Sequence, residues 1–159
     1  RQRGLAQLER GQLKDADIAL QKAYQKRRND AEVVGGLGLV RLREGRHDEA
    51  RELFTRANQL DPSNKWHGLI ATATFWGTVA KAREANRQGK PAEAERLARQ
   101  ALAQQPNNED ARNILAEALV AQNKNQEAEA LLRQMLAGPR PDVGALRTLV
   151  GIQIGRAHV

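Results

Sequence analysis

Residues 34–64 read VGGLGLVRLREGRHDEARELFTRANQLDPSN, and the spacing of their apolar and small residues predicts two short helices joined by a turn. Leu37 and Val40 lie three residues apart and share one helical face, and Gly45 is suited to end that helix in a left-handed conformation. We expect Asp48 to cap the second helix, which cannot continue through Pro62. The second helix carries a single apolar stripe, formed by Ala50, Leu53, Phe54, Ala57 and Leu60.

Small side chains at Gly38, Ala50 and Ala57 would let the axes of the two helices approach closely. The pattern resembles the tetratricopeptide repeat, a pair of helices in about 34 residues. One position departs from that family: Arg41 stands where an aromatic residue is usual, so we expect Val40 and Leu42 to supply the packing there. The family's positions for a Leu-Gly pair, an Ala, an aromatic residue, a second Ala and a Pro are occupied by Leu37-Gly38, Ala50, Phe54, Ala57 and Pro62.

The same pattern recurs along the chain. Residues 1–30 match the central unit at an offset of 34 residues, with Gly11 in the place of the turn residue Gly45. Gly89 follows Gly45 by 44 residues, which indicates an insertion of ten residues, and Asn123 then replaces the next turn glycine. We therefore expect an all-α fold, a right-handed α-solenoid of tetratricopeptide helix pairs with an irregular inserted helix or a hinge near residues 65–89. The predicted array covers residues 1–153, in units of about 1–30, 31–64, 65–108 and 109–142, with 143–153 beginning a further unit.

The inserted region leaves two alternatives open, one long helix or an extra helix joined to a normal one near Gly77. On a helical wheel Trp66 and Trp76 share one apolar stripe, so we expect both in the core. Phe75 points to the opposite side of that helix. It is therefore our candidate exposed aromatic residue, available to a partner or a sugar ring, and the alternative is that it packs against the next unit.

The last residues form a separate segment. Residues 153–159, Gln-Ile-Gly-Arg-Ala-His-Val, back-translate to CAG ATC GGA AGA GCA CAC GTC, and from its second base this string matches a common short-read sequencing adapter. Our hypothesis is that residues 154–159 are a non-native tail, read through from a fragmentary gene assembly and without biological meaning, and the predicted array therefore leaves them out. The chain begins at Arg1 without a start methionine or signal peptide, so we expect a fragment from the middle of a longer protein.

Composition and charge exclude several classes of function. The net charge is +7, but 26 basic residues are interleaved with 19 acidic ones and aromatic residues make up 3%, so we do not expect a nucleic-acid surface. No cysteine is present, and His47, His67 and His158 have no partner at ligand spacing, so we expect no catalytic residue, no metal site and no cofactor. Gly35 to Gly38 is not preceded by a strand, and helix packing accounts for it better than a phosphate loop. No stretch reaches the ~18 apolar residues of a membrane span, so we expect no membrane insertion of this fragment.

The resemblance to tetratricopeptide proteins implies that partners bind on the concave surface, which is lined by the first helix of each unit. Taken singly, each residue there can also be read as an ordinary solvated helix position. Their types do not form the ring of Lys, Asn and Arg with which some relatives hold a C-terminal carboxylate. In the central and fourth units the candidate groove residues are Glu32, Gly35, Leu39, Leu42, Arg43, Asp110, Asn113, Glu117 and Ala121.

The central unit, the following Lys65-Trp66 and the insertion ATATFWGTVAKAREA together resemble the tetratricopeptide region of the family called cellulose synthase operon protein C. That resemblance implies a periplasmic scaffold which links cellulose synthase to an outer-membrane export pore. It implies protein partners, among them cellulose synthase subunits and an outer-membrane barrel, and contact with a glucan chain. The alternative that the repeats leave open is a general adaptor for protein–protein interactions in another envelope or cytoplasmic assembly.

Overall fold

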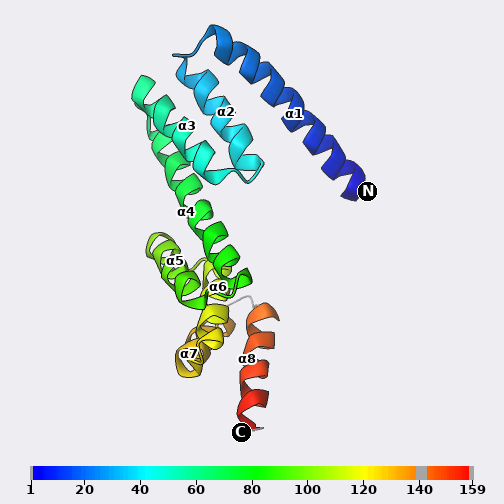
Figure 1. The fold of residues 1–159 in the computed structure, drawn as a ribbon, viewed down its shortest axis with the longest axis vertical. Coiled ribbons are helices and arrows are strands. Elements are labelled where there is room, and N and C mark those ends of the chain that lie inside the picture. Colours follow the sequence, from blue (N-terminus) through cyan, green and yellow to red (C-terminus); the bar gives the residue numbers. More distant parts are fainter. Residues whose placement is uncertain (1, 139–142, 158–159) are drawn as a thin grey trace. The chain divides into compact units, whose positions relative to one another are not determined.

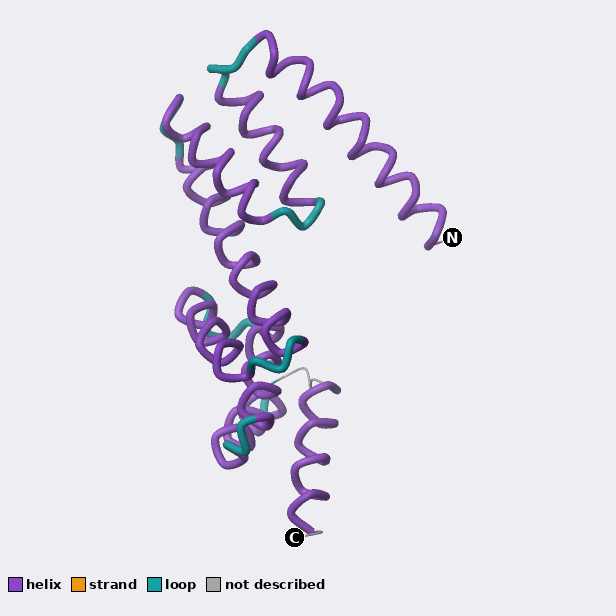
Figure 2. Tube along the Cα trace, viewed as in Figure 1, coloured by secondary structure: helices purple, strands orange, loops and turns teal. Residues whose placement is uncertain are grey.

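The computed structural model describes the backbone of residues 2–138 and 143–157 and the side chains of residues 9–138 and 143–156. All regular structure in these ranges is helical (Figures 1 and 2), which confirms the prediction of an all-α solenoid built of helix pairs. The hand of the superhelix stays a prediction. The helices are α1 (Gln2–Lys26), α2 (Ala31–Arg43), α3 (His47–Leu60), α4 (Asn64–Arg87), α5 (Pro91–Gln104), α6 (Glu109–Ala121), α7 (Asn125–Leu136) and α8 (Val143–Ala157).

The chain divides into two compact units, and the boundary lies inside α4, between Gly77 and Thr78. The first unit contains α1, α2, α3 and the first half of α4, and the second contains the rest of α4 and α5 to α8. Helix α4 is continuous over 24 residues, whereas α2 and α6 have 13 each. The inserted residues therefore lengthen one helix, which decides between the two alternatives that the sequence left open.

Three turns within helix pairs have the same backbone conformation. Gly45, Gly89 and Asn123 have φ angles of 79°, 71° and 61°, which confirms that Asn123 takes the place of a turn glycine. The amide after each of them donates a hydrogen bond to a carbonyl five residues earlier, from Arg46 to Arg41 and from Lys124 to Leu119, both at 2.9 Å. These bonds use carbonyls that the helix end would otherwise leave unpaired.

The core of the first unit depends on two glycines of α2. The Phe54 ring from α3 lies over Gly38, where an added Cβ would come within 2.6 Å of the ring, and the Trp66 indole from α4 fills the space over Gly35. The rings of Phe54 and Trp66 are stacked with centroids 6.3 Å apart. Around them pack the buried side chains of Ala31, Val34, Ala50, Ala57 and Ala73.

The core of the second unit is built mainly of alanine and leucine. Ala85 of α4, Ala94 of α5 and Ala118 of α6 form one buried cluster. Small side chains at these three positions let the helices approach closely, as in the first unit. Ala128, Leu132 and Met135 of α7 are buried as the repeat spacing predicted, and α8 packs against α6 and α7.

Two predictions about helix ends are wrong. Helix α1 continues through Gly11, because a lone glycine lowers helix stability by about 1 kcal/mol but does not end a helix among good helix formers. Residues 2–26 therefore form one helix, without the expected turn at Gly11. Asp48 is not the N-cap of α3 either: the cap is Arg46, without a side-chain bond, and Asp48 lies in the first turn, where a carboxylate also suits the helix dipole.

The aromatic residues of α4 differ in part from the prediction. Trp66 is buried as expected, but Trp76 is only partly buried. Phe75 is 1% exposed, so the prediction of an exposed aromatic residue is wrong. Its ring meets that of Trp76 edge to face, with centroids 5.0 Å apart. An inner helix of a repeat array is covered on two sides, so the residue opposite the tryptophan stripe is buried as well.

Candidate functional site

The candidate groove residues of α2 fall into two groups. Glu32, Leu39 and Arg43 are exposed, and the spacings of seven and four residues place them on one face of the helix. Leu42 is partly buried and packs against the core of the first unit. Gly35 does not line a groove, because the Trp66 indole covers it. The exposed candidates in this helix are therefore Glu32, Leu39 and Arg43.

The carboxylate of Glu32 is held in place by α4, which is the first helix of the following repeat unit. The Lys65 ammonium of α4 donates a hydrogen bond of 2.7 Å to the Glu32 carboxylate and lies 4.3 Å from the centroid of the Trp66 ring. Both charged side chains are largely exposed, so this ion pair contributes little to stability. Glu32, which carries one charge of the pair, and the exposed Leu39 lie on the same face of α2.

The candidates of α6 occupy the same repeat positions as those of α2. Asp110 and Glu117 are exposed and follow Glu32 and Leu39 by 78 residues, which is one insertion plus two repeat lengths. Asn113 is partly buried and takes part in interactions within the protein. The binding role of these residues stays a prediction.

Arg41 joins the first three helices. Its guanidinium lies 3.1 Å from the Asp17 carboxylate of α1, 2.6 Å from Glu44 and 3.8 Å from the Glu49 carboxylate of α3. The side chain is only 12% exposed. The hydrogen bond from Arg41 holds the pKa of the Asp17 carboxyl below its ordinary value, and Asp17 in turn raises the pKa of Arg41.

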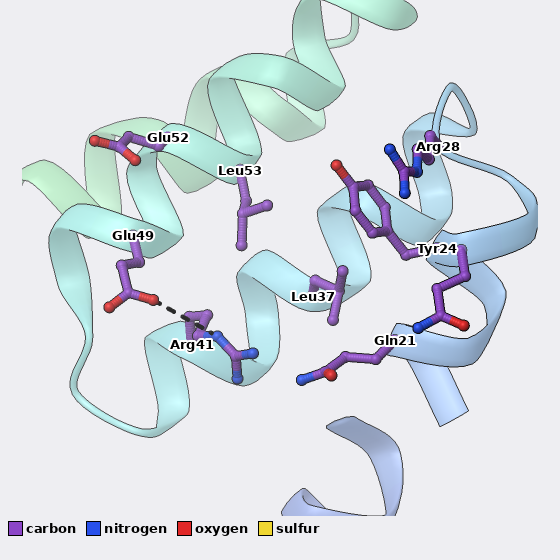
Figure 3. A pocket seen from close by; sticks show the side chains of 9 residues that line it. Gln21, Tyr24, Arg28, Leu37, Arg41, Glu49, Glu52 and Leu53 are labelled. Carbon is purple, nitrogen blue, oxygen red and sulfur yellow. Dashed lines mark ion pairs between the residues drawn. The ribbon is translucent and has the colours of Figure 1, made fainter. Parts of the chain in front are cut away.

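A pocket of about 580 Å³ opens beside Arg41, between α1, α2 and α3 (Figure 3). It lies on the opposite side of α2 from the Glu32 and Leu39 face, since Leu37 and Leu39 are two residues and therefore about 200° apart on the helix. Its volume is within the range of about 300–1,000 Å³ that small-molecule sites occupy. Its lining residues are Gln21, Tyr24, Gln25, Arg28, Leu37, Arg41, Glu49, Glu52 and Leu53.

Sequence reasoning missed this pocket, although one signal for it was present. The equivalents of Arg41 in the later units are Ala85 and Leu119, which are both buried. An arginine at that position turns towards carboxylates instead of filling the space with an apolar side chain. The departure of Arg41 from the repeat pattern was visible in the sequence, but the way in which α1 and α3 frame it was not.

Glu95 is the centre of a second polar cluster, in the second unit. Its carboxylate accepts hydrogen bonds from Lys124 at 3.0 Å, from Arg99 at 2.9 Å and from the Gln122 amide at 2.9 Å. These donors lower its pKa from an ordinary 4.5 to about 2. The cluster ties α5 to the turn between α6 and α7.

Within the described part of the chain, no group of three or more His, Asp or Glu side chains is placed to hold a metal ion. None of the helices in the same ranges combines the length and the apolar character that a membrane crossing requires.

Known proteins resemble this chain over its repeats. Residues 7–73 and 85–150 match the model of the tetratricopeptide repeat family. The chain is 30% identical over 145 residues to Cellulose synthase operon protein C of Pseudomonas fluorescens (strain SBW25), and 34% identical over 149 residues to the protein of that name from Xanthomonas axonopodis pv. citri (strain 306). The alignments cover 91% and 94% of this chain but only 11% and 10% of those relatives, so the chain spans about a tenth of their length. The namesake from Escherichia coli (strain K12) is 30% identical over 105 residues, 64% of this chain and 9% of that protein.

Proposed function

Because this chain belongs to the tetratricopeptide repeat family, whose helix pairs are protein-interaction modules, we propose that it is a scaffold segment of a bacterial cellulose-export assembly. In this proposal the repeats lie in the periplasm. They bind protein partners that connect cellulose synthase in the inner membrane with an export pore in the outer membrane. The chain performs no catalytic step and needs no cofactor.

A binding role is supported by exposed side chains at equivalent positions of two first helices. Glu32 and Asp110 place an acidic side chain at the same repeat position, and Leu39 and Glu117 lie seven residues, about two turns, further along that face. Leu39 is 42% exposed, so this helix presents a large apolar side chain to water. A contact there would bury apolar area that the described residues leave open to water.

The place of the scaffold in cellulose export is supported by similarity alone. Relatives named after the cellulose synthase operon align with more than nine-tenths of this chain. The tetratricopeptide pattern is specific for a fold and serves many partners, so a general adaptor in another envelope or cytoplasmic assembly is the competing proposal.

Site-specific photo-cross-linking in a cellulose-producing host tests the proposal. A photoreactive phenylalanine replaces Leu39 or Glu117 in the full-length protein, and a matched control replaces the exposed Arg133 on α7. We expect cross-links from Leu39 and Glu117 to cellulose synthase subunits or to the outer-membrane pore, and none from position 133. A periplasm-specific reporter fused after residue 138 should be active.

Two results would reject the export scaffold. An inactive reporter would exclude the periplasm and favour a cytoplasmic adaptor. Cross-links from Leu39 only to proteins outside cellulose synthesis would favour an adaptor in another envelope assembly.

A further inference from the structure

We infer that the pocket between α1, α2 and α3 binds a segment of a neutral polysaccharide. The location of the pocket on the far side of α2 keeps it separate from the Glu32 and Leu39 face. The choice of a glucan as the polysaccharide rests on the proposed function, whereas the sugar chemistry is argued from the side chains alone.

The pocket has an apolar floor and one aromatic wall. Leu37 and Leu53 form the floor, and Tyr24 stands at the side, on the last turns of α1 (Figure 3). The Tyr24 side chain is 37% exposed, and the Arg28 guanidinium lies 6.0 Å from the centroid of its ring. Arg28 itself lines the pocket, so the cation and the partly exposed ring lie together at this wall.

The unused polar groups of the pocket are a phenol, an amide, a carboxylate and a guanidinium. Tyr24, Gln25 and Glu52 have no hydrogen-bond or ion-pair partner among the described residues, and Arg28 contacts only the Tyr24 ring. Arg41 and Glu49, by contrast, are already engaged in ion pairs. These four groups are planar, and together they offer both hydrogen-bond donors and hydrogen-bond acceptors to a ligand.

The charges of the pocket favour a neutral ligand. Arg28 and Arg41 are balanced by Glu49 and Glu52, so neither a phosphate nor an acidic or basic peptide finds an excess of opposite charge. A pyranose with equatorial hydroxyls fits better. Its hydroxyl pairs match the forked Glu and Arg groups, and its C–H face can pack on the Tyr24 ring and the leucines.

The site is particular to this repeat. At the positions equivalent to Arg41, the buried Ala85 and Leu119 provide no polar side chain. Asp17 and Glu49 hold Arg41 at the edge of the pocket, and the space that an apolar residue would fill stays open. A sugar chain would therefore be bound at one point of the array and not once in every repeat.

A titration of the ¹⁵N-labelled chain with cellohexaose, followed by amide NMR, tests the inference. We expect concentration-dependent shifts confined to residues 21–28, 37–41 and 49–53. Tyr24→Ala and Glu52→Gln should each weaken binding at least about tenfold, while Tyr24→Phe, which keeps the ring, should lose less. Arg133→Ala on α7 is the matched control and should bind like the parent chain; circular dichroism shows that every variant is folded.

The inference is overturned if cellohexaose at millimolar concentration shifts none of these amides, or if Tyr24→Ala binds as well as the parent. It is also overturned if a mixed-sequence peptide library shifts the same amides while the sugar does not. The scaffold proposal is judged separately, by cross-linking from Leu39. Loss of sugar binding in Tyr24→Ala with unchanged cross-linking would support two independent sites.

Discussion

The Trp66 indole of α4 occupies the space that a side chain at position 35 of α2 would need. Because position 35 is a glycine, the ring of Trp66 can lie directly against the backbone of α2. The ring of Phe54 lies against Gly38 in the same way. The stacked rings of Phe54 and Trp66 then fill the centre of the first unit. These two contacts account for the first and last glycines of the sequence Gly-Gly-Leu-Gly in α2.

Gly35→Ala should therefore destabilise the first unit, because the added methyl overlaps the Trp66 ring. Over-packing of this kind costs about 1–3 kcal/mol. Gly68→Ala is the matched control, since that glycine lies in α4 with open space around it and should gain up to about 1 kcal/mol in helix propensity. Urea unfolding followed by tryptophan fluorescence measures both, and equal effects of the two substitutions would contradict the contact.

Glycines 11 and 45 should respond in opposite directions to alanine. Gly45 has a φ of 79°, so Gly45→Ala is expected to cost about 1–2 kcal/mol. Gly11 lies inside α1 with no neighbour within 4 Å of an added Cβ, so Gly11→Ala should stabilise by about 0.5–1 kcal/mol. Thermal unfolding distinguishes the two cases. A loss of stability in Gly11→Ala would contradict the continuous helix and favour the turn at Gly11 that the repeat spacing predicted.

Ala57→Leu should disturb the first unit more than the second. Ala57 is fully buried between α3 and its neighbours, and three added carbons should cost about 1–3 kcal/mol. Damage in a repeat array fades with distance, because each repeat contacts only its neighbours. Hydrogen exchange should show lost protection over residues 31–64 and retained protection from Ala128 to Met135. Uniform loss along the whole chain would mean one cooperative unit and contradict the repeat interpretation.

The second unit should lose stability in acid because of Glu95. Its pKa is depressed to about 2 in the folded chain, so its contribution is complete above the ordinary value of 4.5 and is lost as the pH falls from there towards 2. After allowance for solvent around a partly exposed group, we expect about 1 kcal/mol.

Glu95→Gln should flatten this part of the pH dependence. Glu117→Gln, at an exposed glutamate without an ion pair among the described residues, should leave the pH dependence unchanged. Unfolding free energies between pH 2 and 6 make the comparison. Parallel curves for the parent chain and Glu95→Gln would show that the cluster around Glu95 does not stabilise the fold.

The sequence by itself determined the helix pairs from residue 31 onward and the turns within them, whereas the turn it predicted at Gly11 is absent. Small residues at Ala50 and Ala57 around Phe54 recur because each helix must bury one stripe. A left-handed backbone requires Gly or Asn, which is why Gly45, Gly89 and Asn123 could be recognised by spacing alone. Both signals are local, since they depend only on residues within one helix or one turn. The length of the insertion could likewise be counted from residue numbers.

Only the tertiary structure decided which side chains meet between helices. The sequence predicts Gly35 as a groove residue, but the Trp66 ring covers it, and it predicts Phe75 as exposed, but neighbouring helices bury it. A wheel gives the direction of a side chain from its own helix, but burial depends on what the neighbouring helices place there. The pocket beside Arg41 has the same origin: its walls come from three helices, and their joint geometry is not encoded in the spacing of any one of them.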